Sequence, residues 1–217
     1  MDGAVDNRPG GVFARAAVEG ASTALALLMD ELSHAVLVAS AKGQLLHANQ
    51  VARDELARRR VLALHEGCLY ATDERDGRVL VQALARAETG LRSLIALRAK
   101  GAGRVSVAVV PLHAPTAPAG PSVALVFSRA TVCDALMLCF FARNHGLTPT
   151  EEQVLAILCQ GYSAPQVAVQ LRVAVSTVRS HVRSMCTKTH SNGVRALVGQ
   201  VAVLPPLVSP RLQDPLH

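Results

Sequence analysis

Apolar residues recur at helical spacing in the last third of the chain, in segments that are each short. From Thr148 to Leu158 they fall on one helical face, and the segment from Ser163 to Leu171 repeats the pattern over a shorter length. Each segment opens with Ser or Thr followed three residues later by Glu or Gln, which is the spacing of a capping box. After a turn of a few residues, a third helix is predicted from about Val175 to Lys188. The pattern therefore predicts three short helices joined by tight turns.

The first two-thirds of the chain mixes strand and helix patterns. Short apolar runs bounded by turn residues predict strands, and apolar residues repeated every three or four positions predict helices. The predicted elements are a helix at 22–32, strands at 35–38 and 44–47, helices at 49–60 and 76–89, and strands at 91–97, 104–112 and 122–127. This order indicates an α+β fold, in which an antiparallel sheet with helices is followed by an all-α domain.

A further helix, from Thr131 to about Asn144, is predicted between these two parts. Its start has the S/T-x-x-D spacing of a cap, and Val132, Leu136 and Phe140 fall on one stripe. Such a wide apolar face must be covered, either by the front domain or by a second copy of the chain. The predicted organisation is a loose N-terminal tail at 1–21, a domain at 22–128, a linker helix at 129–145, a helical domain at 146–204 and a C-terminal tail at 205–217.

The charge of the chain is positive and unevenly distributed. The formal net charge is +6, with a pI of about 9.5. Residues 142–217 hold 7 Lys and Arg against 3 Asp and Glu, whereas residues 1–141 hold 15 against 13. A basic excess concentrated in one segment is the electrostatic footprint expected of a protein that binds phosphates, so a nucleic-acid partner is indicated.

The third predicted helix carries long cations and small hydroxyls on the face opposite its apolar residues. Long cations reach phosphates or guanine edges, while small side chains allow the backbone to approach the major groove closely. The pattern therefore predicts a helix-turn-helix from Ala164 to Arg183 that binds double-stranded DNA. Its predicted DNA-binding residues are Ser176, Thr177, Arg179, Ser180, Arg183, Thr187 and Lys188.

This segment resembles the LuxR-type (GerE-like) DNA-binding domain, a four-helix module. The matching residues, in register, are Leu147, Thr148, Pro149, Glu151, Val154, Leu155, Gly161, Ser163, Val167, Ala168, Leu171, Thr177, Val178 and His181. The resemblance implies that the second and third helices are the scaffold and recognition helices. It also implies that Arg179, Ser180 and Arg183 lie where the family contacts DNA, and that residues 193–201 form a fourth helix used for dimerisation.

Three residues depart from the pattern of that family. Thr150 replaces the usual Arg, Arg172 replaces a glycine in the turn, and Ala174 stands where a Ser cap often begins the recognition helix. We expect Arg172 to adopt the backbone conformation that the glycine has in the family, and we expect the recognition helix to lack a side-chain cap of its own.

The front domain resembles a PAS-type sensor. The resemblance rests on Ala35–Val38, Gly43–Leu46 and the pair Ala48–Asn49, which look like the opening hairpin of that family and the Asn that follows it. It implies an apolar cavity suited to a small apolar ligand or to haem, for which the candidate ligands are His47, His65 and His113. The alternative from the residues alone is a general α+β dimerisation domain with a filled core.

Several other classes of protein are disfavoured by the composition. An acyl-homoserine-lactone receptor domain depends, by family resemblance, on pocket tryptophans, and the chain has none. No Ser/His/Asp or Cys/His arrangement indicates catalysis, and five cysteines without a CxxC pair indicate reduced thiols rather than a metal site. No signal peptide and no apolar run of membrane-spanning length are apparent, so we expect a cytoplasmic protein that is not an enzyme.

These patterns lead to one functional hypothesis and two alternatives. The hypothesis is a sequence-specific DNA-binding transcriptional regulator, controlled by its sensor domain and acting as a homodimer, with RNA polymerase as a further partner. DNA binding requires no cofactor or metal. The alternatives are a cofactor-binding redox sensor that uses haem or flavin, and a sigma-factor-like promoter-binding protein. The second is disfavoured because the front of the chain shows no helical promoter-melting domain.

Overall fold

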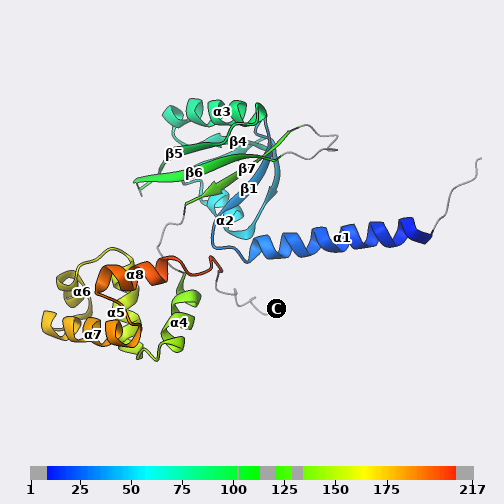
Figure 1. Ribbon diagram of the computed structural model, residues 1–217. Helices are drawn as coiled ribbons and strands as arrows, with labels where there is room; N and C mark the ends of the chain where they lie inside the picture. Colours follow the sequence, from blue (N-terminus) through cyan, green and yellow to red (C-terminus); the bar gives the residue numbers. More distant parts are fainter. Residues whose placement is uncertain (1–8, 102, 113–120, 129–133, 209–217) are drawn as a thin grey trace, which may run out of the picture. The chain divides into compact units, whose positions relative to one another are not determined.

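The computed structural model describes all of the chain except residues 1–8, 102, 113–120, 129–133 and 209–217, and for residues 9–19 it describes the backbone only. It contains two compact units, Met1–Val126 and Phe127–His217 (Figure 1). Among the described residues, no helix is long and apolar enough to cross a membrane. The predicted loop at 113–121 lies almost wholly outside the described residues, as do the first residues of the predicted linker helix and most of the C-terminal tail.

The N-terminal unit is built on a five-stranded sheet. Its strands are β1 (Val36–Ser40), β2 (Leu45–Ala48), β5 (Ser93–Ala99), β6 (Gly103–Leu112) and β7 (Ser122–Phe127). Their order across the sheet is β2-β1-β7-β6-β5, and the β1–β2, β1–β7 and β5–β6 pairs are antiparallel. The predicted α+β class, with an antiparallel sheet in the front domain, is thus confirmed.

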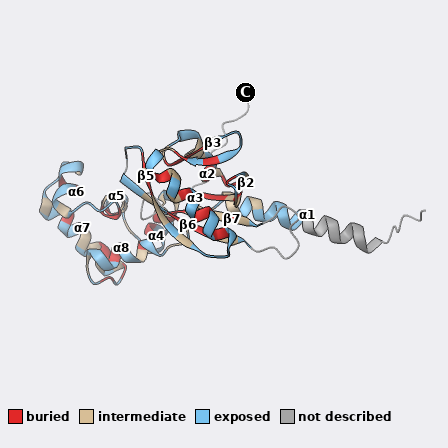
Figure 2. Ribbon diagram, turned by 90° about the horizontal axis from the view of Figure 1, so that it is seen from above, coloured by how far each residue is buried: buried red, intermediate tan, exposed pale blue. Residues whose placement is uncertain are grey.

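One face of this sheet forms the core of the N-terminal unit. The inward residues Leu37, Leu97, Val107 and Leu125 alternate with less buried ones along their strands and are almost wholly inaccessible to water. Helix α3 (Glu74–Glu88) packs on β5 and β6, with its own buried residues on one side (Figure 2). The described part of the core therefore consists mainly of aliphatic side chains.

A second, two-stranded sheet was not predicted. Strands β3 (Leu62–His65) and β4 (Cys68–Ala71) pair as a hairpin, joined by Glu66 and Gly67, which both have positive φ. Two successive positive φ values are those of a type I′ turn, which right-handed strand twist favours. The usual signal for this turn is Asn-Gly or Asp-Gly, and Glu-Gly does not resemble it. The hairpin was missed for that reason.

Helix α1 is longer than the sequence predicted. It runs from Pro9 to Asp30, whereas the prediction placed a loose tail at 1–21 and began the helix at Ser22. The prediction of a wholly loose tail was wrong, because glycines at positions 10, 11 and 20 obscured a segment rich in alanine, which has the highest helix propensity. Pro9 is at the first helical position, where its missing N–H has no cost.

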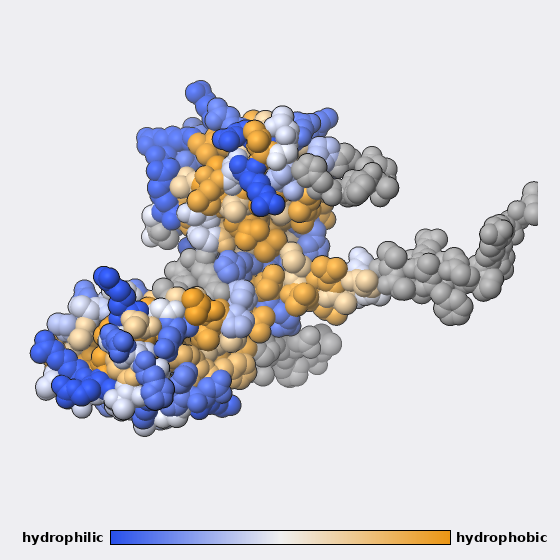
Figure 3. Space-filling view, in the orientation of Figure 1, coloured by the Kyte–Doolittle hydropathy of each residue, from blue (hydrophilic) through white to orange (hydrophobic). Residues whose placement is uncertain are grey.

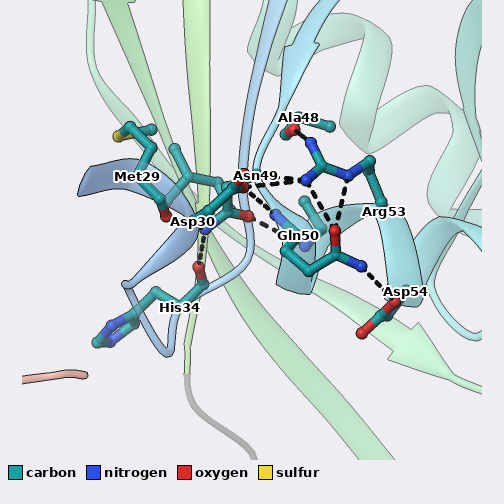
Figure 4. Close-up of polar contacts among 10 residues, drawn as sticks. Met29, Asp30, His34, Ala48, Asn49, Gln50, Arg53 and Asp54 are labelled. Atoms are coloured by element: carbon teal, nitrogen blue, oxygen red, sulfur yellow. Dashed lines mark hydrogen bonds and ion pairs between the residues drawn. The ribbon is translucent and has the colours of Figure 1, made fainter. Parts of the chain in front are cut away.

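A buried asparagine joins the end of α1 to the start of α2 (Gln50–Arg58). The Asn49 side chain is inaccessible to water, and its Nδ2 donates hydrogen bonds to the carbonyl oxygens of Met29 and His34, at 2.9 and 2.8 Å (Figure 4). Its Oδ1 accepts from the backbone N–H groups of Val36 and Ala52, both at 3.0 Å. All four hydrogen-bonding positions are used, so Asn49 fixes where the chain leaves α1 and enters the sheet.

The described residues of the C-terminal unit form a bundle of five helices. They are α4 (Ala135–Asn144), α5 (Pro149–Cys159), α6 (Ala164–Leu171), α7 (Val175–Lys188) and α8 (Val194–Ala202). Leu138 and Phe141 of α4 belong to the same buried cluster as Val154, Val178 and Leu197. The helix predicted as a linker therefore has part of its apolar face covered by the C-terminal unit itself, an arrangement that the sequence prediction did not consider.

Candidate nucleic-acid interface

The turn between α6 and α7 positions the predicted recognition helix. Arg172 has φ 55° and ψ 43°, the left-handed conformation, and the N–H of Val173 donates to the carbonyl oxygen of Ala168 at 3.0 Å. This bond, with a second one from Arg172 to Val169, forms a Schellman motif, in which glycine is the usual residue. The expectation that Arg172 adopts the conformation of the replaced glycine is confirmed.

Helix α7 begins without a side-chain cap, as the sequence predicted. Ala174 is the N-cap residue and has no side-chain acceptor for the first N–H groups. The first N–H groups of any helix have no intrahelical partner, and they carry the positive end of the helix dipole. The N–H of Thr177 donates to the carbonyl oxygen of Ala174 at 3.0 Å, so the uncapped start leaves those of Val175 and Ser176 available to water or to an anion such as a phosphate.

The two faces of α7 differ as the sequence predicted. Val178 and Met185 are fully buried in the core, and Val182 packs against it. The exposed residues on the opposite side are Ser176, Thr177, Arg179, Ser180, Arg183 and Thr187. In the space-filling view, hydrophilic side chains gather over α6 and α7 (Figure 3). Helix α7 thus offers a polar, basic face to a partner.

Two arginines dominate this face. Arg179 and Arg183 are four residues apart, so their side chains leave the helix on the same side, one turn apart. Neither forms an ion pair with a carboxylate in the described part of the chain. Ser180 lies beside them and is small enough to let the helix backbone approach a groove. The geometry suits contacts with phosphates and base edges.

Lys188 makes contacts within the domain that the sequence did not predict. Its Nζ donates to Oε2 of Glu151 at 2.7 Å and to the carbonyl oxygen of Gly146 at 3.0 Å. These bonds join the end of α7 to the start of α5. The ammonium is thus engaged within the domain, and we do not include Lys188 in the interface proposed below. Thr187, although exposed, donates its hydroxyl to the carbonyl oxygen of Arg183 at 3.1 Å.

Glu151 is the acidic partner in this arrangement and is itself buried. It completes the predicted capping box, because its Oε2 accepts from the N–H of Thr148 at 2.7 Å while Thr148 Oγ1 accepts from the N–H of Glu151 at 3.3 Å. Burial acts to raise the pKa of Glu151, but hydrogen bonds from Lys188, Ser184 and Thr148 outweigh it and lower the pKa to about 2. One carboxylate therefore caps α5 and holds α7.

The structure describes two of the three candidate haem ligands considered from the sequence. His47 lies on β2 and His65 on β3, and both are exposed, while His113 lies outside the described residues. Within the described part of the chain, no group of three or more His, Cys, Asp or Glu side chains could hold a metal ion.

Comparison with known families identifies the C-terminal domain. Residues 145–198 match the family described as bacterial regulatory proteins, luxR family. These residues, which include α5, α6 and α7, therefore form a LuxR-type helix-turn-helix domain. A search of curated proteins gave no match.

Three solved structures have limited similarity to the chain. A phage VqmA–DPO complex is 15% identical, with 87% of this chain and 93% of that chain covered and a TM-score of 0.38. A Vibrio cholera VqmA–ligand–DNA complex is 14% identical, with 82% and 88% covered and a TM-score of 0.36. A PAS domain from Desulfitobacterium hafniense is 16% identical, with 46% and 96% covered and a TM-score of 0.34. At these TM-scores the similarities do not establish a function.

Proposed function

We propose that this protein is a transcriptional regulator that binds specific DNA sequences through α7 and receives its signal in the N-terminal PAS-like unit. The observation that carries the proposal is the exposed face of Arg179, Ser180 and Arg183 in a LuxR-type domain. A basic helical face on a helix-turn-helix fits the major groove, where cations contact both phosphates and guanine.

The two arginines have different proposed roles. Arg179 is nearer the start of α7 and contacts a phosphate, whereas Arg183 reaches deeper into the groove and contacts a base. Ser176 and Thr177, in the first turn, bond to phosphates together with the uncapped N–H groups of the helix. Ser180 contributes by its small size. Lys188 supports this face indirectly, because it holds the end of α7 against α5.

The regulator acts as a homodimer in this proposal. Two copies of a helix-turn-helix contact two half-sites, which doubles the contacts with DNA. The exposed leucines of α1, such as Leu25 and Leu28, supply an apolar surface that a second copy can cover. The protein acts in the bacterial cytoplasm, where RNA polymerase is the further partner of a DNA-bound regulator.

The signal reaches the DNA-binding domain by changing the spacing or pairing of the two copies. A small apolar ligand between the sheet and its helices is one source of the signal. Haem or flavin is the alternative, and an absorbance spectrum of the purified protein distinguishes them. A Soret or flavin band would favour a redox sensor, whereas a colourless protein would favour a colourless ligand.

The test of the proposal is selection of bound fragments from genomic DNA, followed by binding of single variants to the selected site. If Arg183 contacts a guanine, Arg183→Ala should cost about 1–3 kcal/mol and relax the preference at one base pair. Arg179→Ala should weaken binding to all sequences alike and reduce the salt slope by about one. Unaltered binding by the double variant would contradict the assignment of α7 as the recognition helix.

A further inference from the structure

A groove outside the sheet core opens beside the β5–β6 hairpin of the N-terminal unit. It has a volume of about 430 Å³ and is lined by Thr72 and Asp73, which precede α3, and by residues 98–101, 103 and 104 of the hairpin. This volume is within the range of about 300–1,000 Å³ that is usual for small-molecule sites. Most of its polar lining is basic, contributed by Arg98, Lys100 and Arg104.

A second basic segment adjoins the groove. The N–H of Lys100 donates to the carbonyl oxygen of Arg60 at 3.0 Å, and Thr72 Oγ1 donates to the same oxygen at 3.2 Å. These two bonds hold the backbone of Arg60, just after α2, against the hairpin and against the segment that precedes α3. The lining of the groove itself contains Arg98, Lys100 and Arg104, and we call it the basic groove.

The carboxylates nearby neutralise only part of this charge. Glu55 pairs with Arg58 and Arg60, at 3.9 and 3.5 Å. Asp73 and Asp76 both pair with Arg98, at 3.5 and 3.6 Å. Arg59, Lys100 and Arg104 have no ion pair within the described residues, although Arg104 donates to the carbonyl oxygen of Ala96. Of the three cations that line the groove, Arg98 is thus paired, and Lys100 and Arg104 are the two without a carboxylate partner among the described residues.

Residues 1–126 contain 14 Lys and Arg against 12 Asp and Glu, a net charge of +2. The two unpaired cations of the basic groove therefore equal this net charge. Uncompensated cations around a concave surface raise the local concentration of anions.

We propose that the basic groove binds a phosphate-bearing molecule through Lys100 and Arg104. Phosphate carries two charges and several acceptor oxygens, so it can pair with more than one of these cations at once, through charge-assisted hydrogen bonds. The charged side chains in the lining fit such a ligand better than the apolar ligand considered for the sheet core. A role of this site in signalling rests on the proposed function, but the binding itself does not.

The probe for this site is inorganic pyrophosphate, titrated into the full-length protein by calorimetry at constant ionic strength. Pyrophosphate should bind and should raise the melting temperature by a few degrees. The double variant Lys100→Gln, Arg104→Gln should weaken binding at least tenfold. The matched control is Arg86→Gln, Arg92→Gln, which removes the same charge from two exposed positions of the unit and should bind normally.

Measuring DNA binding by the same variants distinguishes a small phosphorylated ligand from the phosphates of the DNA backbone. If free pyrophosphate binds, a small phosphorylated molecule is the ligand. If it does not, but Lys100→Gln, Arg104→Gln alone lowers the salt slope of DNA binding by about two, the groove takes phosphates of the DNA backbone. Absence of both effects, or equal losses in the control variant, would overturn the proposal.

Two further comparisons keep the outcome clear. Circular dichroism checks that the variants are folded, and Lys100→Gln alone replaces the double variant if loss of the Arg104 bond to Ala96 prevents folding. Failure of the full-length protein to bind any DNA would contradict the proposed function, whereas pyrophosphate binding would still establish the groove.

Discussion

At the scale of single residues, Glu151 makes the stability of the C-terminal domain depend on acid. Its pKa is about 2 in the folded protein, below the ordinary value of 4.5. Folding therefore favours the ionised carboxylate. This contribution is fully present above about pH 4.5, and it is lost as the pH falls from there towards 2.

The variant Glu151→Gln tests this dependence. It removes the ion pair with Lys188, so we expect it to lower the free energy of unfolding at pH 7 by on the order of 1–3 kcal/mol. The difference from the wild type should shrink near pH 2. Urea unfolding at both pH values measures it, with Glu152→Gln, in the same first turn, as the control. An equal deficit at both pH values would contradict the ionised carboxylate as its cause.

A substitution at Arg172 gives a second prediction at the scale of single residues, and here the free energy of unfolding should rise. A side chain in the left-handed conformation costs about 1–2 kcal/mol, and glycine avoids this cost while losing some conformational entropy on folding. Arg172→Gly should therefore raise the free energy of unfolding by about 0.5–1 kcal/mol. Thermal unfolding measures the change. Arg172→Ala, which retains a Cβ, should give no such gain, and a destabilised Gly variant would contradict the Schellman turn.

At the scale of the element, the sequence predicted best where local signals and burial agree. Helices α5, α6 and α7 have caps or turn residues next to regular apolar stripes, and their predicted bounds are close to the observed ones. The β3–β4 hairpin was missed because its turn has an uncommon residue pair. The start of α1 was missed because glycines obscured its alanine content.

The role of Lys188 was missed for another reason. On a helical wheel it falls with the basic face of α7, and nothing in local spacing indicates an acceptor 37 residues earlier in the chain. The capping box of Glu151 was apparent from sequence, but one of its oxygens also serves Lys188, which only the packing of α7 on α5 reveals. Long-range pairs of this kind depend on tertiary structure and leave no periodic signal.

A third prediction concerns helix α4 and the N-terminal boundary of the DNA-binding domain. Since Leu138 and Phe141 are part of the buried cluster, a fragment of residues 134–208 should fold and bind DNA weakly. A fragment of residues 146–208 should be less stable by about 3 kcal/mol or more, because it leaves cavities where two large side chains pack. Thermal unfolding of both fragments decides this, and equal stability would show α4 to be dispensable.

At the scale of the whole molecule, helix α1 has leucine side chains that a single copy of the chain leaves exposed to water. Leu25 and Leu28 are 60% and 58% exposed and lie three residues apart, so they share one face of the helix. An isolated helix with such a face is only marginally stable in water. The Asn49 hydrogen bonds fix the end of this helix without covering its leucines.

The last prediction is that this face joins two copies of the protein. Leu25→Asp, Leu28→Asp should convert a dimer into a monomer, because two carboxylates would lie where apolar side chains are buried. Val81→Asp, at an exposed apolar position on α3, should leave the dimer intact. Light scattering measures the mass of each variant. The monomer should still bind a single half-site weakly, since α7 is unchanged, while binding to the full operator should fall far more. A dimer that survives the α1 substitutions would place the pairing surface elsewhere in the chain.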